Sequence, residues 1–217
     1  TRAIHPDVLP DLLQQRLLPL DQAAPELAAP FSDFDLHGGR PAPSAGLKEA
    51  GVLMALVQRE AGLHLILTRR TDTMPTHAGQ IALPGGRRQD NDPSLIATAI
   101  REAHEEVGLD PALVTPIGLA DAYETVSGYR ITPVVGLVRS EPALTADPRE
   151  VAAVFDAPLA FFMDPANHVL EQREWNGLQR RYYAMPWNGH YVRGATAGML
   201  RNLHDALHGE PQGEGKS

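Results

Sequence analysis

The sequence predicts an α+β domain, and two features support this fold class. Residues 92–108 have the pattern of an amphipathic helix with a marker at each end. Apolar runs of strand length lie on both sides of that helix, and the pair at 50–58 and 63–69 has the spacing of a hairpin. A chain of 217 residues is long enough for one such domain with an ample core.

The N-terminal part of the chain is predicted to contain one helix. Leucines recur at near-helical spacing within residues 5–20, which indicates a short amphipathic helix. Residues 25–43 are rich in Pro, Ala, Gly and Asp, so we expect a flexible arm or a loop that covers the site. The predicted organisation is an N-terminal helix and Pro/Ala-rich arm at 1–45, a folded domain at 46–208, and a disordered polar tail at 209–217.

The helix at the centre of the chain has well-defined limits. We expect Asp92 to be its N-cap, Pro93 its first residue and Gly108 its C-terminal stop. Small and apolar residues recur on one side of it at about 3.6 residues per turn. This side is predicted to pack against a sheet through Ile96, Ala99, Ile100, Ala103 and Val107.

Three glutamates, Glu102, Glu105 and Glu106, are predicted to share an arc of about 100° roughly opposite the apolar side. Like charges one turn apart destabilise a helix, and no lysine lies among them, so we expect a bound cation. Hard oxygen ligands in a chain without cysteine suit Mg²⁺ or Mn²⁺, and Mg²⁺ often takes its remaining ligands from substrate phosphates. The alternative is a cluster of solvated side chains with no ligand.

Residues next to this helix have the chemistry of a phosphate site. Gly85 and Gly86 allow the backbone to turn tightly or to approach a ligand closely. Arg101 can hold a carboxylate or a phosphate in a bidentate pair. Further arginines lie near the glycines in a chain with few lysines, which indicates a binding site for a small polyanion. These arginines are Arg69, Arg70, Arg87 and Arg88. For Arg87 and Arg88, exposed positions that serve solubility are an equal alternative.

The segment from Gly86 to Leu109 resembles the Nudix box, G-x5-E-x7-R-E-U-x-E-E-x-G-U, where U is a bulky apolar residue. The half that begins at Arg101-Glu102 matches closely. In the first half Asp92 replaces the glutamate, and eight residues rather than seven precede Arg101. That insertion is a feature of the coenzyme A pyrophosphatase branch of the Nudix superfamily.

A second segment, which begins at residue 66, resembles the L-L-T-x-R-S-x3-R-x3-G-x3-F-P-G-G signature of the same branch. Pro75 stands in the place of the second arginine, and the candidates for the missing phosphate contact are Arg69, Arg87 and Arg88. Thr71 replaces the serine and Leu83 the phenylalanine. The residues that match are Thr68, Arg70, Gly79, Pro84, Gly85 and Gly86.

The second half of the chain is predicted to supply more strands. Because a proline cannot donate to a neighbouring strand, Pro133 should mark an edge or a bulge. Asn188-Gly189 is a strong signal for a hairpin turn, and a last helix is expected after Arg193, where the sequence resembles the family's W-G-A-T-A-x-x-L. Strand-like segments occur at 114–120, 129–139, the start of 150–162, 178–185 and 190–193, with a loop at 123–128.

The resemblance implies a fold and a reaction. The fold would be the Nudix α/β/α sandwich with a mixed central β-sheet, and the reaction would be hydrolysis of a pyrophosphate. Glu102 and Glu106 would hold the metal, and Glu105 would be a third ligand or the base, as Glu150 from a later loop could also be. Arg101 would support the glutamates, so the expected catalytic residues are Arg101, Glu105 and Glu106. The expected substrate-binding residues are Arg69, Arg70, Gly85, Gly86 and Arg87.

In the coenzyme A branch the products would be 3′,5′-ADP and 4′-phosphopantetheine. Hydrolysis of another nucleoside diphosphate derivative, such as ADP-ribose or NADH, and a non-catalytic nucleotide-binding module are the alternatives. The net charge of −8 argues against nucleic-acid binding. No apolar run has the length of a membrane span and no basic leader is visible, so we expect a cytoplasmic protein with a small-molecule substrate.

Overall fold

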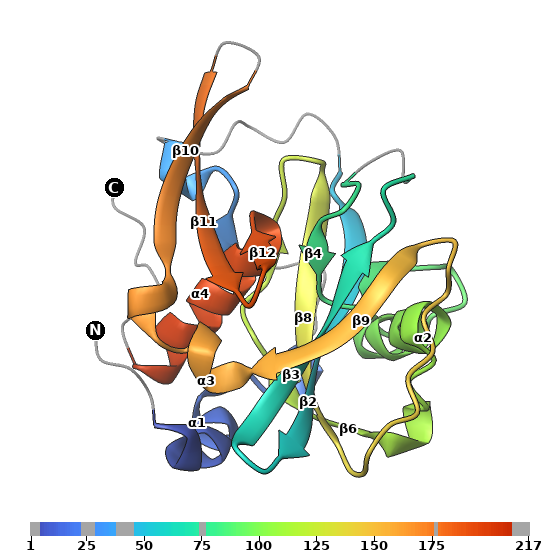
Figure 1. Ribbon diagram of the computed structural model, residues 1–217. Coiled ribbons are helices and arrows are strands. Elements are labelled where there is room, and N and C mark those ends of the chain that lie inside the picture. Colours follow the sequence, from blue (N-terminus) through green and yellow to red (C-terminus); the bar gives the residue numbers. More distant parts are fainter. Residues whose placement is uncertain (1–4, 23–28, 38–45, 74–76, 176–177, 210–217) are drawn as a thin grey trace.

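A mixed β-sheet lies between helices in the computed structural model, which describes residues 5–22, 29–37, 46–73, 77–175 and 178–209 (Figure 1). Its nine strands are β1 (Phe31–Ser32), β2 (Lys48–Arg59), β3 (Gly62–Arg70), β4 (Ile81–Ala82), β5 (Gly85–Arg87), β6 (Val114–Leu119), β7 (Tyr123–Glu124), β8 (Tyr129–Val138) and β9 (Val151–Pro158). A second sheet of three strands contains β10 (Val169–Trp175), β11 (Leu178–Trp187) and β12 (His190–Arg193). The helices are α1 (Leu9–Arg16), α2 (Leu95–Val107), α3 (Leu159–Phe162) and α4 (Ala195–Leu207). Short 3₁₀ segments lie at Pro6–Val8, Leu20–Gln22, Asp35–His37, Pro111–Leu113 and Pro165–Asn167.

The large sheet is organised around β2. Along its main path the strand order is β1-β7-β8-β2-β3-β4, with β5 paired to β2, β6 to β8 and β9 to β3. β2 runs parallel to β8 and antiparallel to β3 and β5. The sheet is therefore mixed, and the predicted hairpin of β2 and β3 is confirmed.

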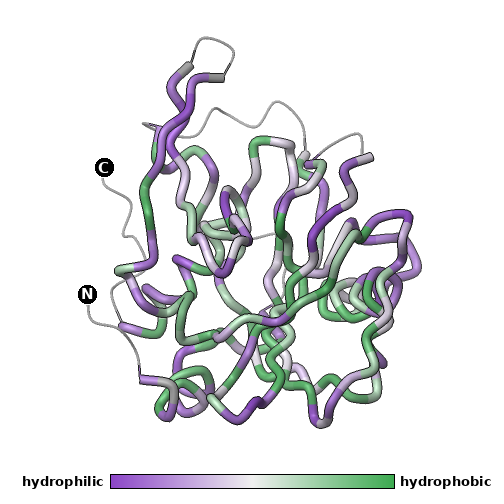
Figure 2. Tube along the Cα trace, in the orientation of Figure 1, coloured by the Kyte–Doolittle hydropathy of each residue, from purple (hydrophilic) through white to green (hydrophobic). Residues whose placement is uncertain are grey.

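Both faces of this sheet are covered by apolar side chains, as the sandwich requires. Met54 and Leu56 of β2 belong to one hydrophobic cluster, which includes residues of α1, α3 and α4. Leu53 and Ala55 belong to a second cluster, which includes residues of α2. Figure 2 shows the hydrophobic colours gathered on the central strands, whereas the projecting end of β10 and β11 is hydrophilic. The predicted α/β/α arrangement is confirmed.

Helix α2 packs on the sheet through the side that the sequence predicted. Ala99, Ala103 and Val107 are fully buried, and the half-buried Ile96 and Ile100 pack against the same cluster. The helix lies very close to β2, as a Cβ atom added at Gly51 would lie only 2.4 Å from the Leu95 carbonyl oxygen. Gly108 ends the helix in the left-handed conformation, as predicted.

The predicted N-terminus of α2 is wrong. Ser94 is the N-cap and its hydroxyl accepts a hydrogen bond from the Ala97 N–H at 3.1 Å, so the helix begins at Leu95. Pro93 therefore lies before the helix. The reason is that the Asp92 carboxylate, which could have capped, is turned into the protein, where other groups bind it.

The position of Pro133 also differs from the prediction of an edge or a bulge. Pro133 lies in the interior strand β8, opposite Val52 of β2. Its carbonyl oxygen accepts a hydrogen bond from the Ala120 N–H at 3.0 Å, and its nitrogen points to the same edge of the strand, at the gap between β6 and β7. The missing N–H faces this gap and interrupts no ladder. The irregularity lies nearby in β6, between Pro116 and Gly118.

The N-terminal segment joins the same core. Leu9 and Leu13 of α1 are fully buried in the cluster that contains α4, and Leu18 forms a bridge to Leu119 of β6. The helix is shorter than the predicted 5–20. Of the predicted arm, β1 pairs in parallel with β7, whereas residues 38–45 and the tail at 210–217 lie outside the described residues.

The C-terminal elements follow the prediction apart from one strand. β11 and β12 form the predicted hairpin, and Asn188 and Gly189 at its turn have φ angles of 45° and 81°. Strand β10, which pairs with β11, was not predicted. Among the described helices, none is both long and apolar enough to cross a membrane.

Gly51→Ala should separate α2 from β2. The added methyl group would collide with the Leu95 carbonyl and lie 3.0 Å from the Ala99 nitrogen, so we expect a loss of about 1–3 kcal/mol in the free energy of unfolding, measured in urea. Gly46→Ala is the control, because a Cβ atom there has no neighbour within 4 Å. Equal stability of the two variants would contradict this packing.

Candidate active site

The helix glutamates line a pocket of about 230 Å³ at the C-terminal part of α2. The loop before β9 supplies the other wall. Lining residues are Glu102, Glu105, Glu106, Asp147, Arg149 and Glu150. The pocket is therefore rich in carboxylates, with one arginine at its border.

Glu106 is the most buried of these carboxylates, with 5% of the residue exposed. The Gly85 N–H donates to its Oε2 at 3.1 Å, and Nη1 of Arg70 lies 3.9 Å from its Oε1. Burial raises the pKa of Glu106 to about 7, against the opposing effects of these two groups. Glu106 is buried although it does not belong to the apolar side of α2, because β5 packs beside the helix.

Arg101 occupies the space between the other two glutamates. Its Nη1 donates to Oε1 of Glu102 at 2.8 Å and to Oε2 of Glu105 at 2.9 Å. Its Nε and Nη2 donate to the two oxygens of Asp92, each at 2.9 Å. The repulsion predicted among the glutamates is thus partly relieved by the protein itself. Arg101 acts on carboxylates of this chain, since all three of its nitrogens already donate hydrogen bonds.

Asp92 is the buried anchor of this network, with 6% of the residue exposed. Besides Arg101, it accepts hydrogen bonds from the Gln89 N–H and the Thr98 hydroxyl, each at 2.9 Å. The hydrogen bonds from Arg101 hold the pKa of the Asp92 carboxyl far below its usual range. The same pair raises the pKa of Arg101. Asp92 is therefore a charged partner of Arg101 and not a helix cap.

The two glycines make room for protein groups in this structure. A Cβ atom at Gly85 would lie 2.5 Å from the Gly51 carbonyl oxygen, and one at Gly86 would lie 2.5 Å from Oε2 of Glu102. Glycine is needed at both positions because a side chain would collide with β2 at Gly85 and with the Glu102 carboxylate at Gly86. Burial raises the pKa of Glu102, which the nearby Arg101 opposes.

The structure separates the arginines that were expected to bind substrate. Arg70 lies beside Glu106, with Nη1 3.9 Å from its Oε1, whereas Arg69 pairs with Asp72 at 2.8 Å. Arg87 is exposed, and its carbonyl oxygen accepts a hydrogen bond from Arg101. Arg88 pairs with Glu49 at 2.8 Å. Pro75, where the resemblance expects another arginine, lies outside the described residues.

Two pocket residues were not found from the sequence. Asp147 reaches the site because its N–H donates to the Glu106 carbonyl oxygen at 2.9 Å, at the end of α2. Arg149 binds both oxygens of Asp147 and thereby lowers the pKa of Asp147 to about 2. A run of charged residues at 147–150 was the available signal, but only the fold brings it to α2. Glu150, named as an alternative base, also lines the pocket.

The donor set fits a divalent cation. Carboxylate oxygens are the ligands that Mg²⁺ and Mn²⁺ prefer, and burial raises the pKa of Glu102 and Glu106, so a cation would stabilise their charged forms. Within the described ranges no three acidic or histidine side chains are grouped as ligands of one ion. The predicted three-glutamate centre is therefore not preformed, because Arg101 draws Glu102 and Glu105 toward itself.

Comparisons with known proteins show the family to which the chain belongs. A family model described as NUDIX domain matches residues 47–186. The chain is 41% identical over 157 residues to the protein called Uncharacterized Nudix hydrolase NudL of Enterobacter sp. (strain 638), a match that covers 72% of this chain and 81% of that protein. It is 37% identical over 160 residues to Nudix hydrolase 15, mitochondrial, of Arabidopsis thaliana, covering 70% of this chain and 56% of the plant protein. The crystal structure of the M. smegmatis Nudix hydrolase RenU is similar at a TM-score of 0.48 and 19% identity, covering 77% of this chain and 90% of that one.

The protein is an enzyme of the pyrophosphohydrolase class, whose members cut diphosphate linkages. Within that class, the chain belongs to the Nudix family. Nudix hydrolases act on compounds that contain a nucleoside diphosphate.

Glu106→Gln should stabilise the metal-free protein at high pH. The pKa of a glutamate is about 4.3 in an unfolded chain, and in the folded protein the pKa of Glu106 is about 7. Below about pH 4.3 the Glu106 carboxyl is neutral in both the folded and the unfolded chain, and its burial does not lower the free energy of unfolding. As the pH rises to 7 the carboxyl ionises first in the unfolded chain, so this stability is lost. In urea with EDTA, the advantage of the variant should grow by roughly 2 kcal/mol between pH 5 and pH 8. Glu60→Gln, in the exposed turn after β2, is the control, and a pH-independent difference would contradict the expectation.

Asp92→Asn should leave Arg101 with an incomplete buried network. Breaking one partner of a buried ion pair costs about 3 kcal/mol, which urea unfolding would measure. Turnover should also fall, because Arg101 then positions Glu102 and Glu105 less firmly. The matched control is Asp90→Asn, which removes an exposed carboxylate from the same loop. Indistinguishable effects of the two substitutions would show that Asp92 does not anchor the site.

Proposed function

We propose that the protein hydrolyses the pyrophosphate bond of coenzyme A or its derivatives, with Mg²⁺ or Mn²⁺, and releases 3′,5′-ADP and 4′-phosphopantetheine. One observation carries the proposal: Arg70, the arginine of the coenzyme A-type segment that begins at residue 66, lies 3.9 Å from the buried Glu106. The segment that resembles a substrate signature thus approaches the helix that resembles the Nudix box at Glu106.

The carboxylates would hold the cation and handle the proton. Glu102 and Glu106 are the proposed ligands, and Glu105 is either a third ligand or the base; when bound, a divalent cation neutralises phosphate charge and lowers the pKa of a water molecule. To bind the cation, Glu102 and Glu105 would both have to give up their hydrogen bonds to Nη1 of Arg101. The remaining hydrogen bonds to Asp92 would keep Arg101 in place. Arg101 is therefore proposed to be a positioning residue.

The reaction consumes one water molecule. The water oxygen forms a bond to one phosphorus, the bond from that phosphorus to the bridging oxygen breaks, and the proton of the water passes to a carboxylate. Glu105 and Glu150 are the two candidates for this base, since both line the pocket and both are exposed. Arg70 would bind a phosphate oxygen, and its position 3.9 Å from Glu106 supports this role.

Hydrolysis of another nucleoside diphosphate derivative is the second candidate. It is favoured by Pro75, which replaces the second arginine of the coenzyme A-type segment. Of the three arginines considered as replacements, Arg88 is paired with Glu49 and Arg69 with Asp72, whereas the Arg87 side chain is exposed. Arg69 is the one of the three that lines a pocket.

A substrate panel with Mg²⁺ tests the proposal. Coenzyme A should give a higher kcat/KM than ADP-ribose or NADH, and Glu106→Gln should lower turnover by at least about a hundredfold, because it removes a charged group from the site. Glu60→Gln makes the same charge change away from the pocket and should leave turnover intact. Preference for ADP-ribose or NADH would support the second candidate, and full turnover in Glu106→Gln would overturn the assigned role of this residue.

A further inference from the structure

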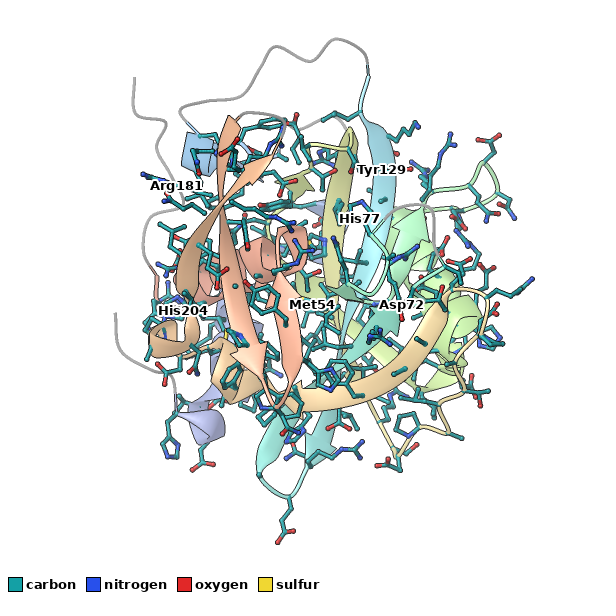
Figure 3. The ribbon with its side chains drawn as sticks, turned by 45° about the horizontal axis from the view of Figure 1, so that its top comes forward. Met54, Asp72, His77, Tyr129, Arg181 and His204 are labelled. Carbon is teal, nitrogen blue, oxygen red and sulfur yellow. The ribbon has the colours of Figure 1, made fainter. Side chains whose placement is uncertain are left out.

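A second pocket, of about 200 Å³, lies between the end of β3, the segment before β4 and the hairpin of β11 and β12. Its volume is too small for a whole nucleotide but suits one substituent group. Polar residues and one glycine supply much of its wall: Arg69, Gly79, Gln80, His190, Tyr191 and Arg193. Figure 3 shows Asp72 and His77, which flank this region, on the side of the molecule away from His204.

The charge of this pocket is opposite to that of the acidic one. Two arginines line it, and none of its lining residues in the described part of the chain is acidic. Arg69 pairs with Asp72, whose side chain is 72% exposed. Arg193 forms no ion pair or side-chain hydrogen bond with any described residue, although the chain as a whole is acidic. Its guanidinium is therefore available for an anionic ligand.

The walls of the pocket are held by contacts outside it. The His190 ring stacks on Phe155, with ring centroids 3.8 Å apart and planes at 9°. The Tyr191 hydroxyl donates to Glu171 of β10. Arg193 lies opposite Ala184 in the β11–β12 ladder, which fixes its backbone. The wall formed by Gly189, His190, Tyr191 and Arg193 is thus fixed by the small sheet, opposite the wall formed by β3 and the segment before β4.

The chain links this pocket directly to the active site. Arg69 lines the basic pocket, while its neighbour Arg70 reaches Glu106. The Thr71 N–H donates to the Glu150 carbonyl oxygen at 2.9 Å, and the Thr71 carbonyl oxygen accepts from the Gly79 N–H at 3.3 Å. Thr71 therefore lies between Glu150, which lines the acidic pocket, and Gly79, which lines the basic pocket.

We propose that the basic pocket binds a phosphate monoester carried by the substrate beyond the pyrophosphate that is cut. A phosphate dianion suits the guanidinium of Arg193, which can form bidentate hydrogen bonds, and Arg69, whose described bonds to Asp72 use Nη2, adds a second positive charge. For the substrate proposed above, the group would be the 3′-phosphate on the ribose. This inference rests on the proposed function, and Arg193 is its main specificity-determining residue.

Arg193→Gln tests the proposal through substrate preference. The ratio of kcat/KM for coenzyme A to that for 3′-dephospho-coenzyme A should fall about ten- to a hundredfold. This is the effect expected when one charge-assisted hydrogen bond to the 3′-phosphate is lost. Arg193→Lys should restore part of the preference. The matched control is Arg173→Gln, which removes the same charge from an exposed position on β10 and should leave the ratio unchanged. An unchanged ratio in Arg193→Gln, or an equal fall in Arg173→Gln, would overturn the proposal.

A binding experiment separates this inference from the proposed reaction. If neither form of coenzyme A is hydrolysed, the proposed function fails, and the pocket is tested by titration with adenosine 3′,5′-bisphosphate and with AMP. The wild-type protein should bind the bisphosphate at least about tenfold more tightly than AMP, and Arg193→Gln should remove the difference. Equal binding of the two nucleotides by the wild-type protein would overturn the subsite by itself.

Discussion

The ion pair between Arg101 and Asp92 is the interaction on which the active site depends. Asp92 precedes α2 and Arg101 lies within it, so their two hydrogen bonds tie the entry of the helix to its middle. Asp92 stays ionised in a buried position because Arg101 keeps its pKa low. A buried charge without this partner would destabilise the fold, and the remaining nitrogen of Arg101 is then directed at Glu102 and Glu105.

The acidic pocket is held in a state that a cation would stabilise. Glu106 and Glu102 both have raised pKa values because burial outweighs their hydrogen bonds. The sheet causes this burial: β5 is fixed against β2, and its Gly85 N–H reaches Glu106. Gly51, Gly85 and Gly86 let β2, β5 and α2 approach one another. The packing of the core thus affects the chemistry of the site through these three glycines.

The segment that follows β3 lies between residues of two pockets of opposite charge. Carboxylates of α2 and of the loop before β9 form one, and arginines of β3 and β12 border the other. A substrate with a metal-bound diphosphate and a further anionic group would match this arrangement of charge. The small sheet covers part of the core and contributes Arg193 to the basic pocket, so under the proposal it would also face the substrate.

Local patterns in the sequence determined the apolar side of α2, its glycine stop, the hairpin of β2 and β3, and the Asn188-Gly189 turn. Each follows from periodicity or turn chemistry within a few residues. Only the tertiary structure decided that Ser94 rather than Asp92 caps the helix, that Glu106 is buried, and that Asp147 and Arg149 join the pocket. Those outcomes depend on groups distant in the chain, because β5 covers Glu106 and Arg101 draws Asp92 inward, and no local pattern encodes which distant group a charged side chain will meet.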